Sequence, residues 1–259
     1  MPNYRLAITT ILASMLVVSA PVFASETDDN IVASAKQSYV FKTYLKGDDV
    51  TIKSKDGVVT LTGTVSEGSH KTLAQEYVAG LPGVKTVDNN LKERGKAPAE
   101  HSDAWLITKV KAALLFHRNV NATGTEVLAK DGTVTLRGKA PSMAQKDLTS
   151  EYAKDVEGVK KVKNEMTVKT AAMKPGETKM GEKMDAMGET IDDASVTALV
   201  KSTLLYHRST SALKTTVETK DGVVNLGGTA KNAAEKDLAT KLVSDVHGVK
   251  KVVNNMTVK

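Results

Sequence analysis

The amino-acid sequence predicts an α+β protein of three small tandem domains, each with the order helix, strand, strand, helix, strand (αββαβ). One segment occurs three times, as KDGVVTLTGTV from Lys55, KDGTVTLRGKA from Lys130 and KDGVVNLGGTA from Lys220. The Gly-Val pairs that begin at Gly83, Gly158 and Gly248 repeat the same two spacings, 75 and 90 residues. Landmarks that keep their spacing without a gap indicate one structural unit present in three copies.

Each copy begins with an amphipathic helix, such as DAWLITKVKAALLF from Asp103 in copy two. Apolar residues recur every four positions there, which places them on one face of a helix. The pairs Ser102-Asp103 and Asp192-Asp193 precede their helices, and these residue types cap helix N-termini. The apolar triplets are Leu106, Val110 and Leu114; Val196, Val200 and Leu204; and Ile31, Ala35 and Tyr39.

A β-hairpin follows this helix in each copy. In copy one, Val50, Ile52 and Ser54 alternate with other residues before the turn, and Val59 and Leu61 alternate with threonines after it. The Asp-Gly pair supplies the positive φ angles that a two-residue type I′ turn requires. A glycine near the end of the second strand is expected to end that strand or to form a bulge. These glycines are Gly63, Gly138 and Gly228.

A second helix and a last strand complete the unit. The glycine of each Gly-Val pair is expected to stop the helix, and the strand reads GVKKVKNEMTV in copy two. We therefore expect each domain to be a three-stranded sheet with two helices on one face. The helix positions are Leu73, Tyr77 and Leu81; Leu148, Tyr152 and Val156; and Leu238, Leu242 and Val246.

The landmarks divide the chain into domains at residues 30–94, 102–170 and 192–259. Residues 171–191 form a linker rich in Met and Lys. Within this linker Met180, Met184, Met187 and Ile191 fall at helical spacing, which favours a helix leading into copy three. Its glycines favour a flexible tether instead, and both alternatives stay open.

The N-terminus is typical of a secretory signal peptide. Arg5 precedes a 15-residue apolar run from Leu6 to Ala20, and Pro21 ends that run. We predict cleavage after Ala24, so that residues 1–24 are removed and the mature protein resides in the periplasm; the alternative is a retained N-terminal anchor. The chain has no cysteine, which excludes disulfides, thiolate metal sites and a lipid anchor on an N-terminal cysteine.

The unit resembles the BON domain. The Asp-Gly hairpin, the following Leu-x-Gly and the closing motif GVKxVxNxM are the residues that resemble it, and copies two and three match best. Copy one departs from the pattern, because Leu91 replaces the terminal Met and Phe41-Lys42-Thr43 stands where copy two has Phe116-His117-Arg118. The resemblance implies periplasmic residence, attachment to anionic phospholipid or envelope proteins, and protection under osmotic or envelope stress.

No catalytic constellation is recognisable in the sequence. The five histidines lack the spacing of a zinc site, and there is no nucleophile elbow, P-loop or dinucleotide fingerprint. We therefore expect a protein that is not an enzyme and that uses no cofactor and no metal. The histidines are His70, His101, His117, His207 and His247.

The first helices of copies two and three are the candidate lipid-binding surface. Each ends in an apolar residue followed by His and Arg, and basic residues lie along both helices. Aromatic groups would enter the headgroup layer while Lys and Arg meet phosphates. The alternative is that Phe116 and Tyr206 close the core and the cations complement the helix dipole. The candidate residues are Trp105, Lys109, Lys111, Phe116, His117, Arg118, Lys201, Tyr206, His207 and Arg208.

The net charge of +6 favours an anionic partner. Export from the cytoplasm and the lack of aromatics among the basic residues argue against nucleic acid. Two functions remain: peripheral binding to anionic phospholipid membranes, or a chaperone-like or scaffolding module that binds periplasmic and outer-membrane proteins. Added salt distinguishes the two, because it weakens charge-driven lipid binding far more than apolar contact with a protein.

Overall fold

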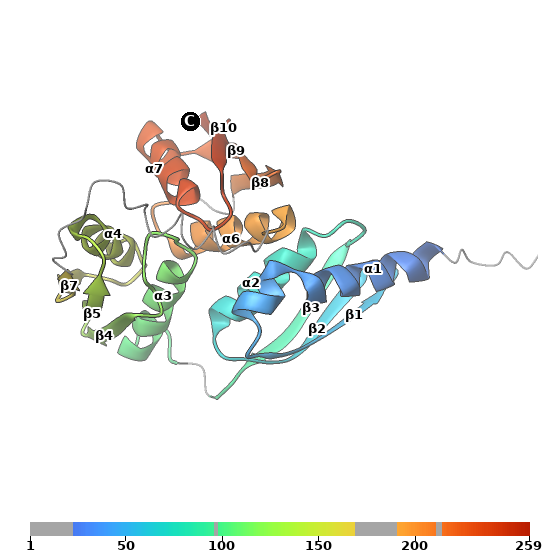
Figure 1. Ribbon diagram of the computed structural model, residues 1–259, viewed down its shortest axis with the longest axis horizontal. Coiled ribbons are helices and arrows are strands. Elements are labelled where there is room, and N and C mark those ends of the chain that lie inside the picture. The colour runs from blue at the N-terminus through green and yellow to red at the C-terminus, as the bar shows by residue number, and fades with distance from the viewer. Residues whose placement is uncertain (1–22, 96–97, 169–190, 211–213) are drawn as a thin grey trace, which may run out of the picture.

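The computed structural model describes residues 23–95, 98–168, 191–210 and 214–259 of the chain. It contains three small α+β units, as predicted, which we call domains 1, 2 and 3 in chain order (Figure 1). The predicted signal peptide lies largely outside the described residues, and so do the linker methionines. No helix in the described part of the chain is long and apolar enough to cross a membrane.

The three domains repeat the same order of elements. Domain 1 contains α1 (Phe23–Gln37), η1 (Val40–Tyr44), β1 (Asp49–Lys55), β2 (Val58–Val65), α2 (Gly68–Ala79) and β3 (Thr86–Glu93). Domain 2 contains α3 (Asp103–Leu115), β4 (Thr125–Lys130), β5 (Thr133–Ala140), α4 (Met143–Lys154), β6 (Lys161–Asn164) and β7 (Thr167–Val168). Domain 3 contains α6 (Asp193–Tyr206), β8 (Thr215–Lys220), β9 (Val223–Ala230), α7 (Ala233–Ser244), β10 (Lys251–Asn254) and β11 (Thr257–Val258).

The second strand of the hairpin is the centre of each sheet. β2 pairs antiparallel with β1 and parallel with β3. In domains 2 and 3 the last strand is split into two short strands, both parallel to the central strand. The sequence predicted one continuous last strand in every copy, and the structure has this only in domain 1.

One asparagine of the last strand makes the same contacts in all three domains, whether that strand is split or continuous. In domain 2 the side chain of Asn164 donates to the carbonyl of Lys146 in α4 (2.7 Å) and accepts from the backbone N–H of Met166 (3.0 Å). Asn89 and Asn254 make the equivalent bonds in the other domains. The asparagine in the closing motif therefore ties the last strand to the second helix, and its role is structural.

The Asp-Gly turns adopt the predicted type I′ geometry. Asp131 and Gly132 have φ angles of 53° and 82°, and the other two turns have similar values. In domain 1 the carboxylate of Asp28 accepts from the backbone N–H groups of Asp56 (2.7 Å) and Gly57 (3.0 Å). An aspartate of α1 therefore holds the hairpin against that helix, and Asp193 of α6 does the same in domain 3.

Replacing Gly132 by valine should lower the free energy of unfolding by about 1–2 kcal/mol. A β-branched residue at a φ of 82° is strained, whereas the neighbouring Lys160 side chain is flexible enough to give way. Urea denaturation of the full chain measures this effect. Thr133→Val is the control and should change stability by less than about 0.5 kcal/mol. Equal midpoints for Gly132→Val and the wild type would contradict the turn geometry.

The first helix of domain 1 ends earlier than predicted. The spacing of its apolar residues predicted a helix that reaches Tyr39. In the structure α1 ends at Gln37 and a π-helical turn follows. The reason lies in domain 3, where Asp192 accepts from the backbone N–H of Tyr39 (3.2 Å) and Ser195 accepts from that of Val40 (3.3 Å). These bonds replace the regular helical pattern with contacts to the start of α6.

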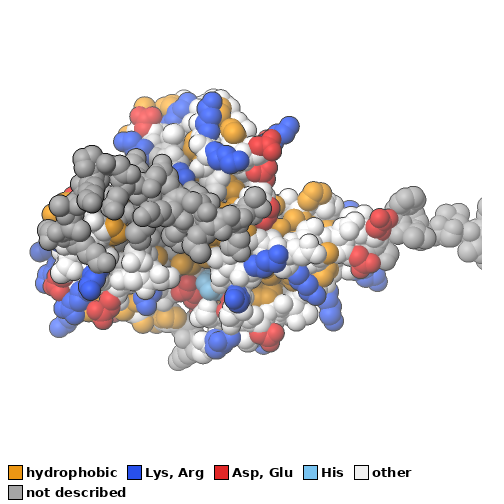
Figure 2. All heavy atoms as spheres, in the orientation of Figure 1, with side chains coloured by type: hydrophobic (Ala, Val, Ile, Leu, Met, Phe, Trp, Pro, Cys, Tyr) orange, Lys and Arg blue, Asp and Glu red, His pale blue; other side chains and the backbone are white. Residues whose placement is uncertain are grey.

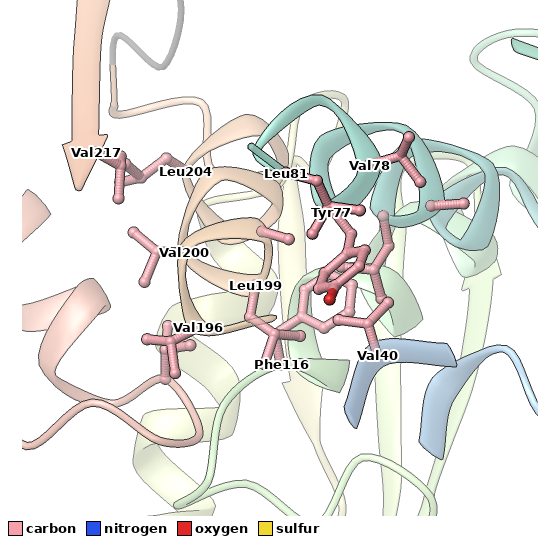
Figure 3. Close-up of a cluster of buried hydrophobic side chains, with 14 of the residues drawn as sticks. Val40, Tyr77, Val78, Leu81, Phe116, Val196, Leu199, Val200, Leu204 and Val217 are labelled. Atoms are coloured by element: carbon pink, nitrogen blue, oxygen red, sulfur yellow. The ribbon is translucent and has the colours of Figure 1, made fainter. Parts of the chain in front are cut away.

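The core extends across domain boundaries. α6 packs against α2, α3 and α7, so it is the helix that all three domains share (Figure 1). One apolar cluster joins the cores of domains 1 and 3, and Phe116 of domain 2 inserts into it. Figure 3 shows Phe116 beside Leu199 of α6 and Val40 of domain 1. The three domains are therefore packed together by apolar contacts.

Candidate functional site

The C-terminal ends of α3 and α6 meet in the middle of the molecule. His117 follows α3 and His207 follows α6, and their Nε2 atoms lie 3.2 Å apart. Both imidazoles are fully buried. Two histidines 90 residues apart in the sequence, at equivalent positions of two domains, are thus in direct contact.

The contact between domains 2 and 3 is reciprocal. His207 Nδ1 lies 3.2 Å from Asp155 Oδ2 of domain 2, and His117 Nδ1 lies 3.4 Å from Asp245 Oδ2 of domain 3. The backbone N–H of Arg118 donates to the carbonyl of Asp245, and that of Arg208 donates to the carbonyl of Asp155, both at 2.9 Å. Each helix end therefore docks on the end of the other domain's second helix through an equivalent backbone hydrogen bond and an equivalent His-Asp pair.

Tyr152 makes the surroundings of His117 different from those of His207. Its ring stacks on His117 with centroids 3.8 Å apart, and its hydroxyl donates to Asp245 Oδ2 at 2.8 Å. The equivalent residue in domain 3 is Leu242. Burial raises the pKa of Tyr152, so its hydroxyl stays protonated and donates at any physiological pH. His117 therefore lies in a more enclosed environment than an isolated helix end.

The buried histidine pair perturbs the pKa values around it. Burial, together with the neighbouring His207, lowers the pKa of His117 to about 4, against the opposing effect of Asp245. Burial alone would raise the pKa of Asp155, but the hydrogen bonds from His207 and Ser209 lower it below its usual value. Asp155 is therefore a carboxylate, and it holds the proton of His207 on Nδ1.

The structure places six of the predicted lipid-binding residues at the junction of the domains. Phe116, His117 and His207 are buried there, where we expected a surface. Arg118 donates from its side chain to the carbonyl of Ser244, and Arg208 Nε lies 3.7 Å from Asp155 Oδ1. Tyr206 lies at the same junction and is partly buried. Phe116 closes a core, which is the alternative to lipid contact that the sequence left open. This core, however, is shared by more than one domain.

Two of the other predicted residues, Trp105 and Lys109, line a hollow where all three domains meet, and Tyr206 lines it too. Lys109 Nζ lies 5.2 Å from the ring centroid of Trp105 and 5.3 Å from that of Tyr206, so the ammonium group contacts two aromatic faces. The hollow has a volume of about 360 Å³, and Lys71 and Thr72 of α2 line its opposite side. Burial raises the pKa of Tyr206 to about 12, so its hydroxyl remains neutral.

The last two predicted residues lie outside the hollow. Lys111 is exposed on α3. Lys201 of α6 forms an ion pair with Glu76 of α2, with Nζ and Oε2 3.5 Å apart, and this pair bridges domains 1 and 3. Within the described ranges, no group of three or more His, Asp or Glu side chains is placed to hold a metal ion.

The sequence reasoning missed Asp155, Asp245, Tyr152 and Lys71. Asp155 and Asp245 stand at equivalent positions shortly before their Gly-Val pairs, and an acidic residue retained at one position of two copies was the available signal. Nothing in the sequence pairs either aspartate with a histidine of the other copy. Lys71 belongs to the divergent copy one, which has no candidate residue of its own in the prediction.

Comparison with known proteins identifies the repeated unit. The family model described as the BON domain matches residues 27–95, 102–170 and 192–259, which is most of the chain. The chain belongs to the BON-domain family. Its three BON domains are the three αββαβ units of the structure.

Curated relatives share these BON domains. The chain is 32% identical over 201 residues to the osmotically-inducible protein Y of Escherichia coli K12, covering 78% of this chain and 93% of that protein. It is 33% identical over 115 residues to the 21 kDa hemolysin of Actinobacillus pleuropneumoniae. It is 32% identical over 115 residues to the outer membrane lipoprotein DolP of Haemophilus influenzae. Each of these two matches covers 44% of this chain and 59% of the relative.

Proposed function

We propose that this protein is a non-enzymatic periplasmic protein of the osmotic and envelope stress response, and that it binds anionic phospholipid surfaces peripherally. The names of its relatives, osmotically-inducible protein Y and outer membrane lipoprotein DolP, support the envelope part of the proposal. The observation that supports lipid binding is the hollow formed by Trp105, Lys109 and Lys71.

The hollow combines the two chemical features that a phospholipid headgroup requires. Trp105 and Tyr206 offer apolar ring surface, which suits the boundary between headgroups and acyl chains. Lys71 and Lys109 both line the hollow and supply two positive charges that would attract a phosphate. Glu93 also lines the hollow and opposes a second anionic group, which favours a singly charged headgroup.

The face of the molecule shown in Figure 2 is not continuously basic. On the face shown in Figure 2, Lys and Arg side chains are interspersed with Asp and Glu. A general attraction to anionic membranes is therefore modest, and a local site is needed for firm attachment. We propose that Lys111, exposed on the same helix as Trp105 and Lys109, adds to the attraction near the hollow.

Charge reversal in the hollow should reduce binding to anionic vesicles. The double change Lys71→Glu and Lys109→Glu should cost on the order of 2–4 kcal/mol of binding free energy, since each basic residue near such a surface contributes about 1 kcal/mol and each reversal adds repulsion. Co-sedimentation with phosphatidylglycerol vesicles at low salt measures the effect. Neutral phosphatidylcholine vesicles should bind weakly with either protein.

The matched control is Lys130→Glu with Lys220→Glu. Both lysines are exposed beside hairpin turns, and their reversal changes the net charge by the same amount. This control should bind anionic vesicles with only a modest loss. Equal losses for the two double variants would argue for general electrostatic attraction and against the hollow. If neither variant loses binding, and wild-type binding is insensitive to salt, the protein-binding function is favoured.

A further inference from the structure

We propose that the junction of His117 and His207 is an acid-sensitive lock, which holds domain 2 against domain 3 near neutral pH and releases it when the pair takes up a second proton. The position of the protons supports this. Asp155 can only accept a hydrogen bond, so the His207 nitrogen 3.2 Å away must carry a proton. Asp245 Oδ2 lies 3.4 Å from Nδ1 of His117, a close charge contact without the geometry of a hydrogen bond.

With both protons on Nδ1, each neutral imidazole directs an Nε2 lone pair at the other. At 3.2 Å this arrangement is favourable when one proton is shared between the two nitrogens. A second proton gives two positive rings in contact, both fully buried. Like charges at this distance, without water, strongly oppose each other. The docked state therefore accepts one proton readily and resists the second.

The surrounding charges do not neutralise a second proton. Asp155 and Asp245 face the pair from the ends of α4 and α7, and Arg118 and Arg208 face it from the ends of α3 and α6. These four charges sum to zero before the histidines are counted. Both carboxylates also accept other hydrogen bonds, from Ser209 to Asp155 and from Tyr152 and Asn119 to Asp245.

One further titratable group lies on the same side. His247, in the turn after α7, acts on His117 as a positive charge when protonated, and its backbone N–H donates to the carbonyl of Phe116. Acid therefore adds positive charge to the junction from three histidines. Asp245 is the carboxylate that opposes this charge at His117.

When domains 2 and 3 separate, the two imidazoles can both be protonated without repelling each other in a buried contact. In water each imidazole takes a proton with an ordinary pKa of about 6.5, whereas burial in the docked state lowers the pKa of His117 to about 4. A group with a lowered pKa stabilises the docked state above its solvent pKa and loses this contribution as the pH falls. Docking should therefore weaken from about pH 6.5 downwards, by about 100-fold at pH 4.

Opening would also change the exposed surface. The junction buries Phe116 completely and Tyr206 partly, and both are residues that we expected to meet lipid. Release by acid would uncover them. This consequence for membrane binding rests on the proposed function, whereas the release itself does not involve lipid and is measured without it.

The test uses the full mature chain, with distance labels on domains 2 and 3. Because the protein has no cysteine, Lys130→Cys and Lys220→Cys introduce the only two thiols for a fluorescence pair. Transfer efficiency should fall between pH 6.5 and 4, with EDTA present and with far-ultraviolet circular dichroism unchanged. The double variant His117→Gln and His207→Gln should lose this pH response. His70→Gln is the matched control, since His70 contacts Asp48 within domain 1 and should leave the response intact.

Hydrogen exchange gives a second readout that needs no histidine variant. The backbone N–H groups of Arg118 and Arg208 cross the junction, and their protection factors should fall about 100-fold by pH 4. The amide of Met166, bound to Asn164 within domain 2, should stay protected. Full protection of Arg118 and Arg208 at pH 4 overturns the proposal, whatever the glutamine variant does. An identical pH response in wild type and in the docked double glutamine variant also overturns it.

Discussion

Replacement of Phe116 by alanine is expected to lower the free energy of unfolding by about 3–5 kcal/mol and to separate the unfolding of domain 2 from that of the other two domains. The side chain is completely buried and belongs to domain 2, yet it packs in the apolar cluster of domains 1 and 3. Its ring meets Tyr44 of domain 1 edge-on, with centroids 5.6 Å apart. Truncation loses this burial and leaves a cavity that the surrounding helices fill only partly.

Guanidinium denaturation followed by circular dichroism measures both effects. The variant should show two transitions where the wild type shows one, because the cluster no longer joins the domains. Leu128→Ala is a suitable control, since Leu128 lies on the outer face of β4 and is 37% exposed. If Phe116→Ala and Leu128→Ala cost the same, the apolar junction contributes little to stability.

Replacement of Gly228 by alanine is expected to cost about 3 kcal/mol or more. Gly228 lies in β9 with a φ of 99°, opposite Thr215 of β8. A Cβ atom there would lie 1.8 Å from the carbonyl oxygen of Lys214, which is a backbone atom and cannot rotate away. The cost combines strain at positive φ with displacement of the paired strand.

The neighbouring Gly227 provides the matched control for this change. Its added Cβ would meet the Thr216 hydroxyl at 2.5 Å, and that side chain can rotate. Gly227→Ala should therefore cost much less, measured by the urea midpoint of the same full-length chain. Similar midpoints for the two variants would mean that the paired strand moves freely and that no glycine is required at position 228.

Local features of the fold were predictable because the sequence determines them over short distances. The Asp-Gly turns follow from the φ angles that these residues adopt, and the predicted caps are present, with Ser102 accepting from Trp105 N and Asp192 from Ser195 N. The second helices, however, end four residues before the glycines that we expected to stop them, at Ala79, Lys154 and Ser244. Those glycines instead occupy the turn into the last strand, with positive φ.

The junction was not predictable, because periodicity reports only on the domain in which it occurs. His117 looks like an exposed cation at a helix end, and only the structure shows Asp245, 128 residues later, beside it. Trp105 and Lys109 were recognised as candidate residues on the same helix. Their position opposite Lys71 depends on how α2 packs, and no pattern within α3 contains that information.

The reciprocal contact between domains 2 and 3 lies within one polypeptide, and this has a consequence for its dependence on dilution. Had the two histidines belonged to separate molecules, pairing would follow protein concentration and would rise whenever a compartment loses water. A covalent tether fixes the effective concentration of the partner, so the ratio of docked to released forms is the same at any dilution. Shrinkage or swelling of the surrounding volume therefore leaves this ratio unchanged, and the composition of the solution determines it instead.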